Sequence, residues 1–152
     1  MEELYFMTPL AGIIGLLIAA VILVSIVKKP GGEGKVAEIA EKIHKGAMVF
    51  MKREFILISI FAAVIALALF FFQDQAYGKL QAGAFLFGCI ASSFAGFVGM
   101  YTATKANVRT TIAAKDEGAA AALNVAFFGG SVMGLTVASM GLIGLGVLFW
   151  KF

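Results

Sequence analysis

Apolar and polar positions along this chain are segregated on the scale of whole helices. Four long uncharged stretches are separated by charged segments, and the stretches are residues 4–27, 55–73, 80–104 and 118–150. A helix needs about 20 mostly apolar residues to cross the hydrocarbon core of a bilayer. In lipid, every backbone amide needs a hydrogen-bond partner within its own segment, which here only a helix provides. The pattern predicts an all-α, polytopic membrane protein with four transmembrane helices.

The charged segment before the second stretch has a helical pattern of a different kind. Apolar side chains recur there at steps of three and four residues, namely Val36, Ile39, Ala40, Ile43, Ala47 and Phe50. Charged residues fill the opposite side, with Glu38 and Lys42 at the favourable i,i+4 spacing. No helix-breaking residue separates this pattern from the apolar run that begins at residue 55. One long helix is therefore expected, amphipathic at its start and apolar in its second part.

Helix boundaries follow from proline, glycine and charge. Pro30 and the two glycines after it end the first helix, because proline cannot continue the hydrogen-bond ladder. A short turn with Gly78 as its breaker joins the second helix to the third. The third helix leaves the membrane near Thr104 and continues beyond it. We expect a single unit over residues 1–152, with helices at about 4–27, 34–73, 79–115 and 118–151.

The distribution of positive charge predicts the orientation. Ten of the twelve Lys and Arg residues lie in the segments 28–54 and 105–117, and the exceptions are Lys79 and Lys151. The positive-inside rule places these two segments in the cytoplasm, so both termini are expected outside. Topology explains the basic residues, so no nucleic-acid partner is expected. The chain is predicted to be a multi-pass protein of the cell membrane.

Small residues recur at every fourth position in the last two stretches. The rows are Ala84, Gly88, Ser92 and Gly96 in the third stretch, and Ala126, Gly130, Gly134 and Ala138 in the fourth. Such rows let two helix backbones approach closely, which favours association in lipid. We expect both rows to be buried against other helices. The second stretch is rich in Phe, Ile and Leu instead and is a candidate for the lipid side.

Candidate chemistry is sparse. The four uncharged stretches contain no Asp, Glu, Lys, Arg or His, although ion translocation usually needs an ionisable group at membrane depth. We expect His44 to be a solvated surface residue and Cys89 to be a small packing residue. Residues 129–131 (Gly-Gly-Ser) lack the Walker spacing and are expected to serve packing. We therefore assign no catalytic, cofactor-binding or metal-ligating residue to this chain.

One segment carries more specific information about function. Residues 96–118 read as a helix that leaves the membrane, with Lys105 and Arg109 at i,i+4 spacing on one side. These two cations are interpreted first as anchors at the lipid headgroups. In a sharper hypothesis, Asn107 and Arg109 dock against another cytoplasmic helix or loop.

Three runs in this region carry a resemblance. They are Gly-Met-x-x-Ala-Thr-x-Ala-Asn-x-Arg-Thr (residues 99–110), Ala-Ala (113–114) and Ala-Phe-x-Gly-Gly-Ser-Val-Met-Gly (126–134). They resemble the N-terminal part of the membrane-bound, ion-pumping pyrophosphatases. Residues 39–55 are similar to the segment before that family's second helix, and residues 141–145 suit the end of its fourth. The resemblance covers nearly the whole chain in order.

The resemblance implies much that lies outside these residues. Members are far longer, with two concentric rings of transmembrane helices, and assemble as homodimers. They hydrolyse magnesium-complexed pyrophosphate at the cytoplasmic side and pump protons or sodium outward. The residues that hold metal and substrate follow the fourth helix, and no position here matches them.

By this resemblance, the chain is an outer-ring scaffold, inactive alone, in a pump that hydrolyses pyrophosphate. Its partners are the lipid bilayer and the pump's remaining C-terminal helices. Magnesium is the implied cofactor. The pumped ion and any potassium requirement stay open, as does whether the chain is a truncated gene product.

Two alternatives belong to other classes. The first is a complete four-helix protein that oligomerises, such as a proteolipid rotor-ring subunit, although no membrane stretch contains the carboxylate that such subunits use. The second is a non-enzymatic assembly or lipid-binding protein that places the basic amphipathic helix 33–54 at anionic headgroups.

Overall fold

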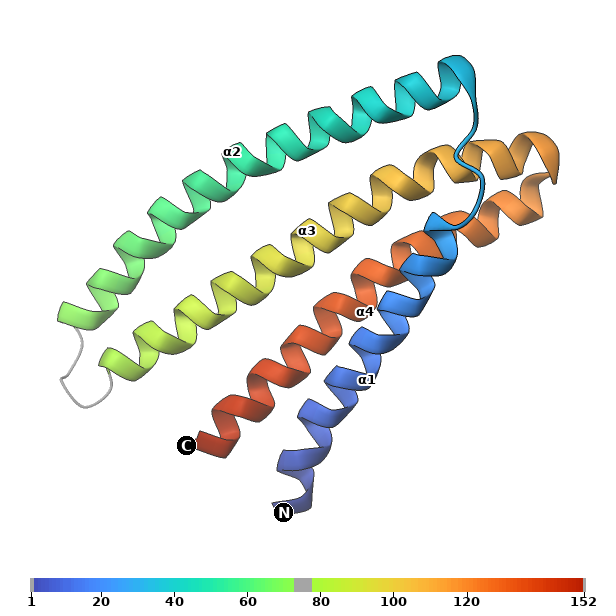
Figure 1. The fold of residues 1–152 in the computed structure, drawn as a ribbon. Coiled ribbons are helices and arrows are strands. Elements are labelled where there is room, and N and C mark those ends of the chain that lie inside the picture. Colours follow the sequence, from blue (N-terminus) through green and yellow to red (C-terminus); the bar gives the residue numbers. More distant parts are fainter. Residues whose placement is uncertain (1, 73–77, 152) are drawn as a thin grey trace.

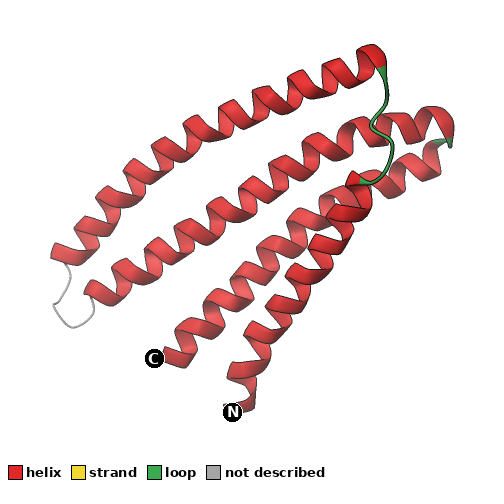
Figure 2. Ribbon diagram, in the orientation of Figure 1, coloured by secondary structure: helices red, strands yellow, loops and turns green. Residues whose placement is uncertain are grey.

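The computed structural model describes residues 2–72 and 78–151, and Figure 1 shows that they form a set of long helices. The helices are α1 (Glu2–Val27), α2 (Gly34–Phe72), α3 (Gly78–Asp116) and α4 (Ala119–Lys151). Figure 2 shows helix and loop, without a strand, over the described residues. All four helices are long and apolar enough to cross a membrane, judged by length and composition. The predicted all-α fold with four membrane-spanning helices is confirmed.

The ends of the helices follow the local sequence. α1 ends just before the Lys-Lys-Pro-Gly-Gly run, and Gly32 and Gly34 have φ values of 78° and 59°, a region that glycine enters without steric cost. α3 ends where the amides of Glu117 and Gly118 both donate to the carbonyl of Ala113, at 2.9 Å each. Gly118 has a φ of 95° and turns the chain into α4.

The turn between α2 and α3 falls mostly at residues 73–77, outside the described part of the chain. Its predicted breaker, Gly78, is the first residue of α3. The role of Gly78 as the breaker of this turn stays a prediction. α2 is continuous from Gly34 to Phe72, as the pattern predicted.

The helices form a layer in the order α2, α3, α4, α1 (Figure 1). α3 packs on both α2 and α4, α4 packs on α1, and α1 also touches α3. Figure 1 shows both termini at one end of the layer, and the α1–α2 and α3–α4 connections at the other. The two segments rich in Lys and Arg therefore lie at one end. The orientation of that end toward the cytoplasm stays a prediction.

A narrow core lies where α1, α3 and α4 meet. Its buried side chains are Ala19, Ile26, Ala106 and Val132. Thr102 and Thr136 are also buried here, and each donates its hydroxyl hydrogen to the carbonyl four residues earlier, at 2.7 Å. Among the described residues, no buried side-chain nitrogen or oxygen lacks a partner.

The two rows of small residues do not form the packing surfaces within this chain. All four members of the α4 row are exposed, and Gly88 and Ser92 of the α3 row are exposed as well. The residues that pack instead follow alternating steps of three and four, for example Val125, Gly129, Val132 and Thr136 on α4. Residues four apart lie about 40° apart around a helix, so a row at steps of four winds away from a neighbouring helix. Residues at alternating steps of three and four stay close to the side that faces this neighbour. The prediction that both rows are buried was wrong for the chain by itself.

Candidate functional site

The most specific polar contacts of the chain lie at the basic end of the layer, where Arg109 of α3 meets the end of α1. Its Nη2 donates to the carbonyl of Val27 at 2.7 Å, and its Nε donates to the carbonyl of Lys29 at 3.0 Å. Its Nη1 donates to the carbonyl of Lys105 at 2.8 Å within α3. The last carbonyls of a helix have no partner within the helix and carry partial negative charge. Arg109 therefore caps α1 from a different helix.

This contact decides between the two interpretations of the exit segment of α3. Arg109 docks on protein, as the sharper hypothesis had it. Asn107 is exposed in this chain, so its part of the hypothesis stays a prediction. Lys105 instead lies over the ring of Tyr101, with its Nζ 5.9 Å from the ring centre. The loop after α1 also lies close to α3, since a methyl group on Gly32 would lie 3.0 Å from Ile112.

His44 connects α2 to α3 at the same end. Its Nδ1 lies 2.8 Å from Oγ1 of Thr104, and its ring meets that of Tyr101 edge-on with centres 5.4 Å apart. Thr104 donates its hydroxyl hydrogen to the carbonyl of Tyr101, at 2.9 Å. A hydroxyl has a single hydrogen, so both contacts of Thr104 are hydrogen bonds when Thr104 accepts from a protonated Nδ1 of His44. The prediction that His44 is a solvated surface residue was wrong. The sequence offers no signal for this contact beyond the placement of His44 on an amphipathic helix.

α1 and α4 approach closely through glycines. A methyl group on Gly12 would lie 2.7 Å from both the carbonyl oxygen of Ser139 and Cγ1 of Ile143. Within one turn of this contact, Gly146 lies against Pro9, which stands inside α1. Glycine is needed where backbones come this near.

α3 and α4 also approach each other closely through glycines. A methyl group on Gly99 would lie 2.7 Å from the sulfur of Met133, and one on Gly129 would lie 2.8 Å from Ala106. The expected packing role of the Gly-Gly-Ser run thus holds at Gly129. Gly130 faces open space.

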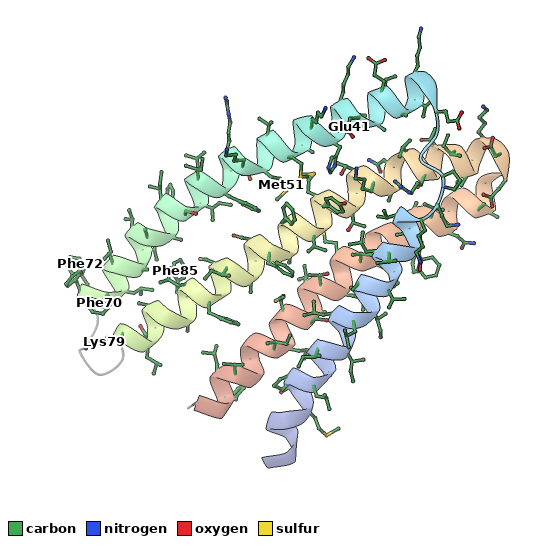
Figure 3. The ribbon with its side chains drawn as sticks, viewed as in Figure 1. Glu41, Met51, Phe70, Phe72, Lys79 and Phe85 are labelled. Atoms are coloured by element: carbon green, nitrogen blue, oxygen red, sulfur yellow. The ribbon has the colours of Figure 1, made fainter. Side chains whose placement is uncertain are left out.

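An open groove runs between α2 and α3. It has a volume of about 730 Å³, and its walls include Phe50, Glu54, Phe85, Cys89 and Ser92. Figure 3 shows Met51 and Phe85, which also line it, at the ribbons of α2 and α3. Cys89 is partly exposed in the groove wall.

The described residues contain no group of three or more His, Cys, Asp or Glu side chains that could hold a metal ion. The geometry instead provides caps, close glycine contacts and interhelical hydrogen bonds. These are means of holding helices together.

Comparison with known proteins identifies the family. A sequence model described as inorganic H⁺ pyrophosphatase matches residues 13–152. The chain belongs to this family of membrane pyrophosphatases. A K⁺-insensitive pyrophosphate-energized proton pump of Methanosarcina mazei is 43% identical over 149 residues, which make up 98% of this chain and 22% of that pump. A K⁺-stimulated pyrophosphate-energized sodium pump of Thermotoga maritima is 40% identical over 150 residues, or 98% of this chain and 20% of that pump.

The resemblance drawn from the motifs is thereby confirmed, and the chain spans about a fifth of the length of these pyrophosphatases. Residues 99–110, which carry much of that resemblance, include the contact residues Gly99, Thr104, Ala106 and Arg109. Part of the run that carries the resemblance therefore packs helices together.

Proposed function

We propose that this chain is the N-terminal scaffold of a membrane pyrophosphatase that couples pyrophosphate hydrolysis to outward pumping of protons or sodium. The observation that carries the proposal is the family match over nearly the whole chain, together with relatives named as pyrophosphate-energized pumps. In this proposal the chain supplies no catalytic residue. The bilayer surrounds it, and the remaining helices of the same pump, assembled as a homodimer, are its partners.

Magnesium enters the proposal through the complete pump. Mg²⁺ prefers carboxylate, carbonyl and phosphate oxygens in octahedral geometry. The donor set described in this chain does not fit, because it groups no three acidic, His or Cys side chains. In the proposal, the rest of the complete pump supplies the metal ligands. The relatives include K⁺-insensitive proton pumps and a K⁺-stimulated sodium pump, so neither the pumped ion nor a K⁺ requirement follows from their names.

The test compares two samples in sealed membrane vesicles. We expect the complete protein that contains this chain to hydrolyse pyrophosphate in a magnesium-dependent way and to build an ion gradient that an ionophore collapses. We expect vesicles with residues 1–152 alone to release no phosphate above background. Hydrolysis by the chain alone would overturn the scaffold assignment, and an inactive complete protein would overturn the pump proposal.

A further inference from the structure

A cleft lies between α1 and α4 at the basic end of the layer. Its volume is about 410 Å³, and its walls include Val21, Ser25 and Lys29 on one side and Asn124, Val125 and Phe128 on the other. Val21, Ser25 and Lys29 recur at steps of four, so the cleft runs lengthwise along α1 and ends in the loop that follows it. Figure 1 shows the end of α1 beside α4, which extends past it. We call this feature the α1–α4 cleft.

The walls of the cleft change from apolar to polar along its length. Val21 and Phe128 are apolar and are 66% and 47% exposed. Val21 lies about two helical turns before Lys28, the first charged residue after the first uncharged stretch, so Val21 lies at the depth of the lipid tails. Lys29 and Asn124 lie nearer the charged end, since Asn124 is about one turn closer to the start of α4 than Phe128. The cleft therefore matches a ligand with an apolar part in the membrane and a polar part at its surface.

The polar end of the cleft is positively charged. Lys29 lies in its wall, Lys28 precedes it in sequence, and the wall contains no acidic side chain among the described residues. Neither lysine has an ion pair within the described part of the chain, where both ion pairs lie within α2. The uncharged stretch 4–27 of α1 and the whole of α4 contain no Asp or Glu. The charge that complements this end of the cleft is therefore negative.

The backbone of Lys29 is held at both of its polar groups. Its amide donates to the carbonyl of Ile26 at 3.0 Å, and its carbonyl accepts from Nε of Arg109 at 3.0 Å. The side chain thus extends from a fixed point, which lowers the entropy lost when it binds a ligand. Asn124 is exposed, and its side chain has no hydrogen bond to another residue that the structure describes. An ammonium and a primary amide are both hydrogen-bond donors, and phosphate oxygens accept from both.

We propose that the α1–α4 cleft binds one anionic phospholipid, with the phosphate at Lys29 and Asn124 and an acyl chain along Val21 and Phe128. The inference goes beyond the proposed function, because it requires only that the helices cross a membrane. Basic pockets between transmembrane helices bind anionic headgroups, whereas a zwitterionic headgroup would bring a second cation close to the lysines. A free phosphate ion has no group that fits the apolar part of the cleft.

The test identifies the lipid that touches Phe128. The complete protein that contains this chain is placed in vesicles with equal amounts of dioleoyl phosphatidylglycerol, which is anionic, and dioleoyl phosphatidylcholine, which is zwitterionic. The photoreactive residue p-benzoylphenylalanine replaces Phe128 and, under light, bonds to C–H groups that touch it. Mass spectrometry then measures the amount of each lipid among the adducts. We expect phosphatidylglycerol to exceed phosphatidylcholine several-fold.

Three substitutions separate a lipid site from general attraction to a basic surface. Lys29→Gln should lower the preference for phosphatidylglycerol about threefold to fivefold, which is the contribution of one lysine near an anionic lipid. Lys29→Arg keeps the charge and should keep the preference. Arg53→Gln is the matched control, because it removes an exposed positive charge next to the uncharged stretch of α2, away from the cleft, and should leave the preference unchanged.

Several outcomes would overturn the proposal. Equal amounts of the two lipids at position 128 would show that the cleft does not select a negative headgroup. The same preference after Lys29→Gln, or an equal loss after Arg53→Gln, would show that Lys29 forms no specific site. A cross-link from position 128 to protein in place of lipid would show that another helix covers the cleft. Pyrophosphate hydrolysis plays no part in this measurement, so its result does not depend on the pump proposal.

Discussion

At the scale of single residues, the chain shows how one side chain can join two helices. Arg109 has a planar guanidinium with donors in a fixed fork, which lets it reach carbonyls of Val27 and Lys29 at once. From the sequence, the same residue is equally suited to a phosphate headgroup. The decision depends on where the end of α1 lies, and a contact across about eighty residues leaves no local pattern.

Replacing Arg109 tests the cap. Arg109→Gln removes charge-assisted hydrogen bonds to the end of α1, and we expect it to lower the free energy of unfolding by about 1–3 kcal/mol. Arg53→Gln removes one positive charge from an exposed side chain of α2 and serves as the matched control. Denaturant unfolding in detergent micelles compares the two. Equal stability of both variants would contradict the capping role.

The His44–Thr104 pair is tested by a double-mutant cycle. Thr104→Val keeps the shape of the side chain but removes the acceptor for His44 Nδ1, and His44→Phe removes the donor. We expect a coupling energy of about 0.5–1.5 kcal/mol in unfolding experiments, since one hydrogen bond is shared. Thr110→Val, at a hydroxyl without a described hydrogen bond, should show no coupling with His44→Phe. Additive effects at Thr104 would mean that the 2.8 Å contact contributes nothing to stability.

At the scale of elements, the sequence predicted where helices form but not which sides meet. Length and hydrophobicity were sufficient for the first task, because lipid leaves the backbone no alternative to a helix. The second task failed because the chain contains 18 glycines, and small residues occur on several sides of α3 and α4. Gly129 packs on Ala106 while its neighbour Gly130 faces open space, and no property of either residue distinguishes them.

The α1–α4 contact depends on a specific glycine. Gly12→Ala places a methyl group against a backbone carbonyl of α4, which cannot turn aside as a flexible side chain would. We expect a loss of about 1–3 kcal/mol in unfolding free energy, as for other overpacked sites. Gly83→Ala adds the same methyl group to α3 in open space and should be neutral or slightly stabilising, because alanine orders more readily in a helix. Thermal unfolding in one detergent ranks the two, and the reverse order would contradict the close α1–α4 approach.

At the scale of the whole molecule, the layer collects the two basic segments at one end and both termini at the other. The sequence anticipated this grouping because an even number of crossings returns the chain to its starting side. The sequence did not predict the order in which the helices pack in the layer. The order α2, α3, α4, α1 arises because α1 packs on α4 and not on α2, its neighbour in sequence.

Orientation is the prediction at this scale. The positive-inside rule places the basic end in the cytoplasm. In a cysteine-free background, Lys45→Cys should react with a membrane-impermeant maleimide only after the cells are opened, and Lys79→Cys should react in intact cells. The opposite pattern would show that the chain is inserted the other way round.

The pairing of α1 with α4 has a consequence for synthesis. α1 ends at Val27, and α4 begins at Ala119. At about 5–20 residues per second, the roughly ninety intervening residues take about 5–20 s to emerge from the ribosome. During that time α1 stands in the bilayer with its glycine-lined side unmatched, while α2 passes without contacting it. A nascent chain halted within this interval should be a ready substrate for the proteases that clear orphaned membrane segments, and one that has completed α4 should survive.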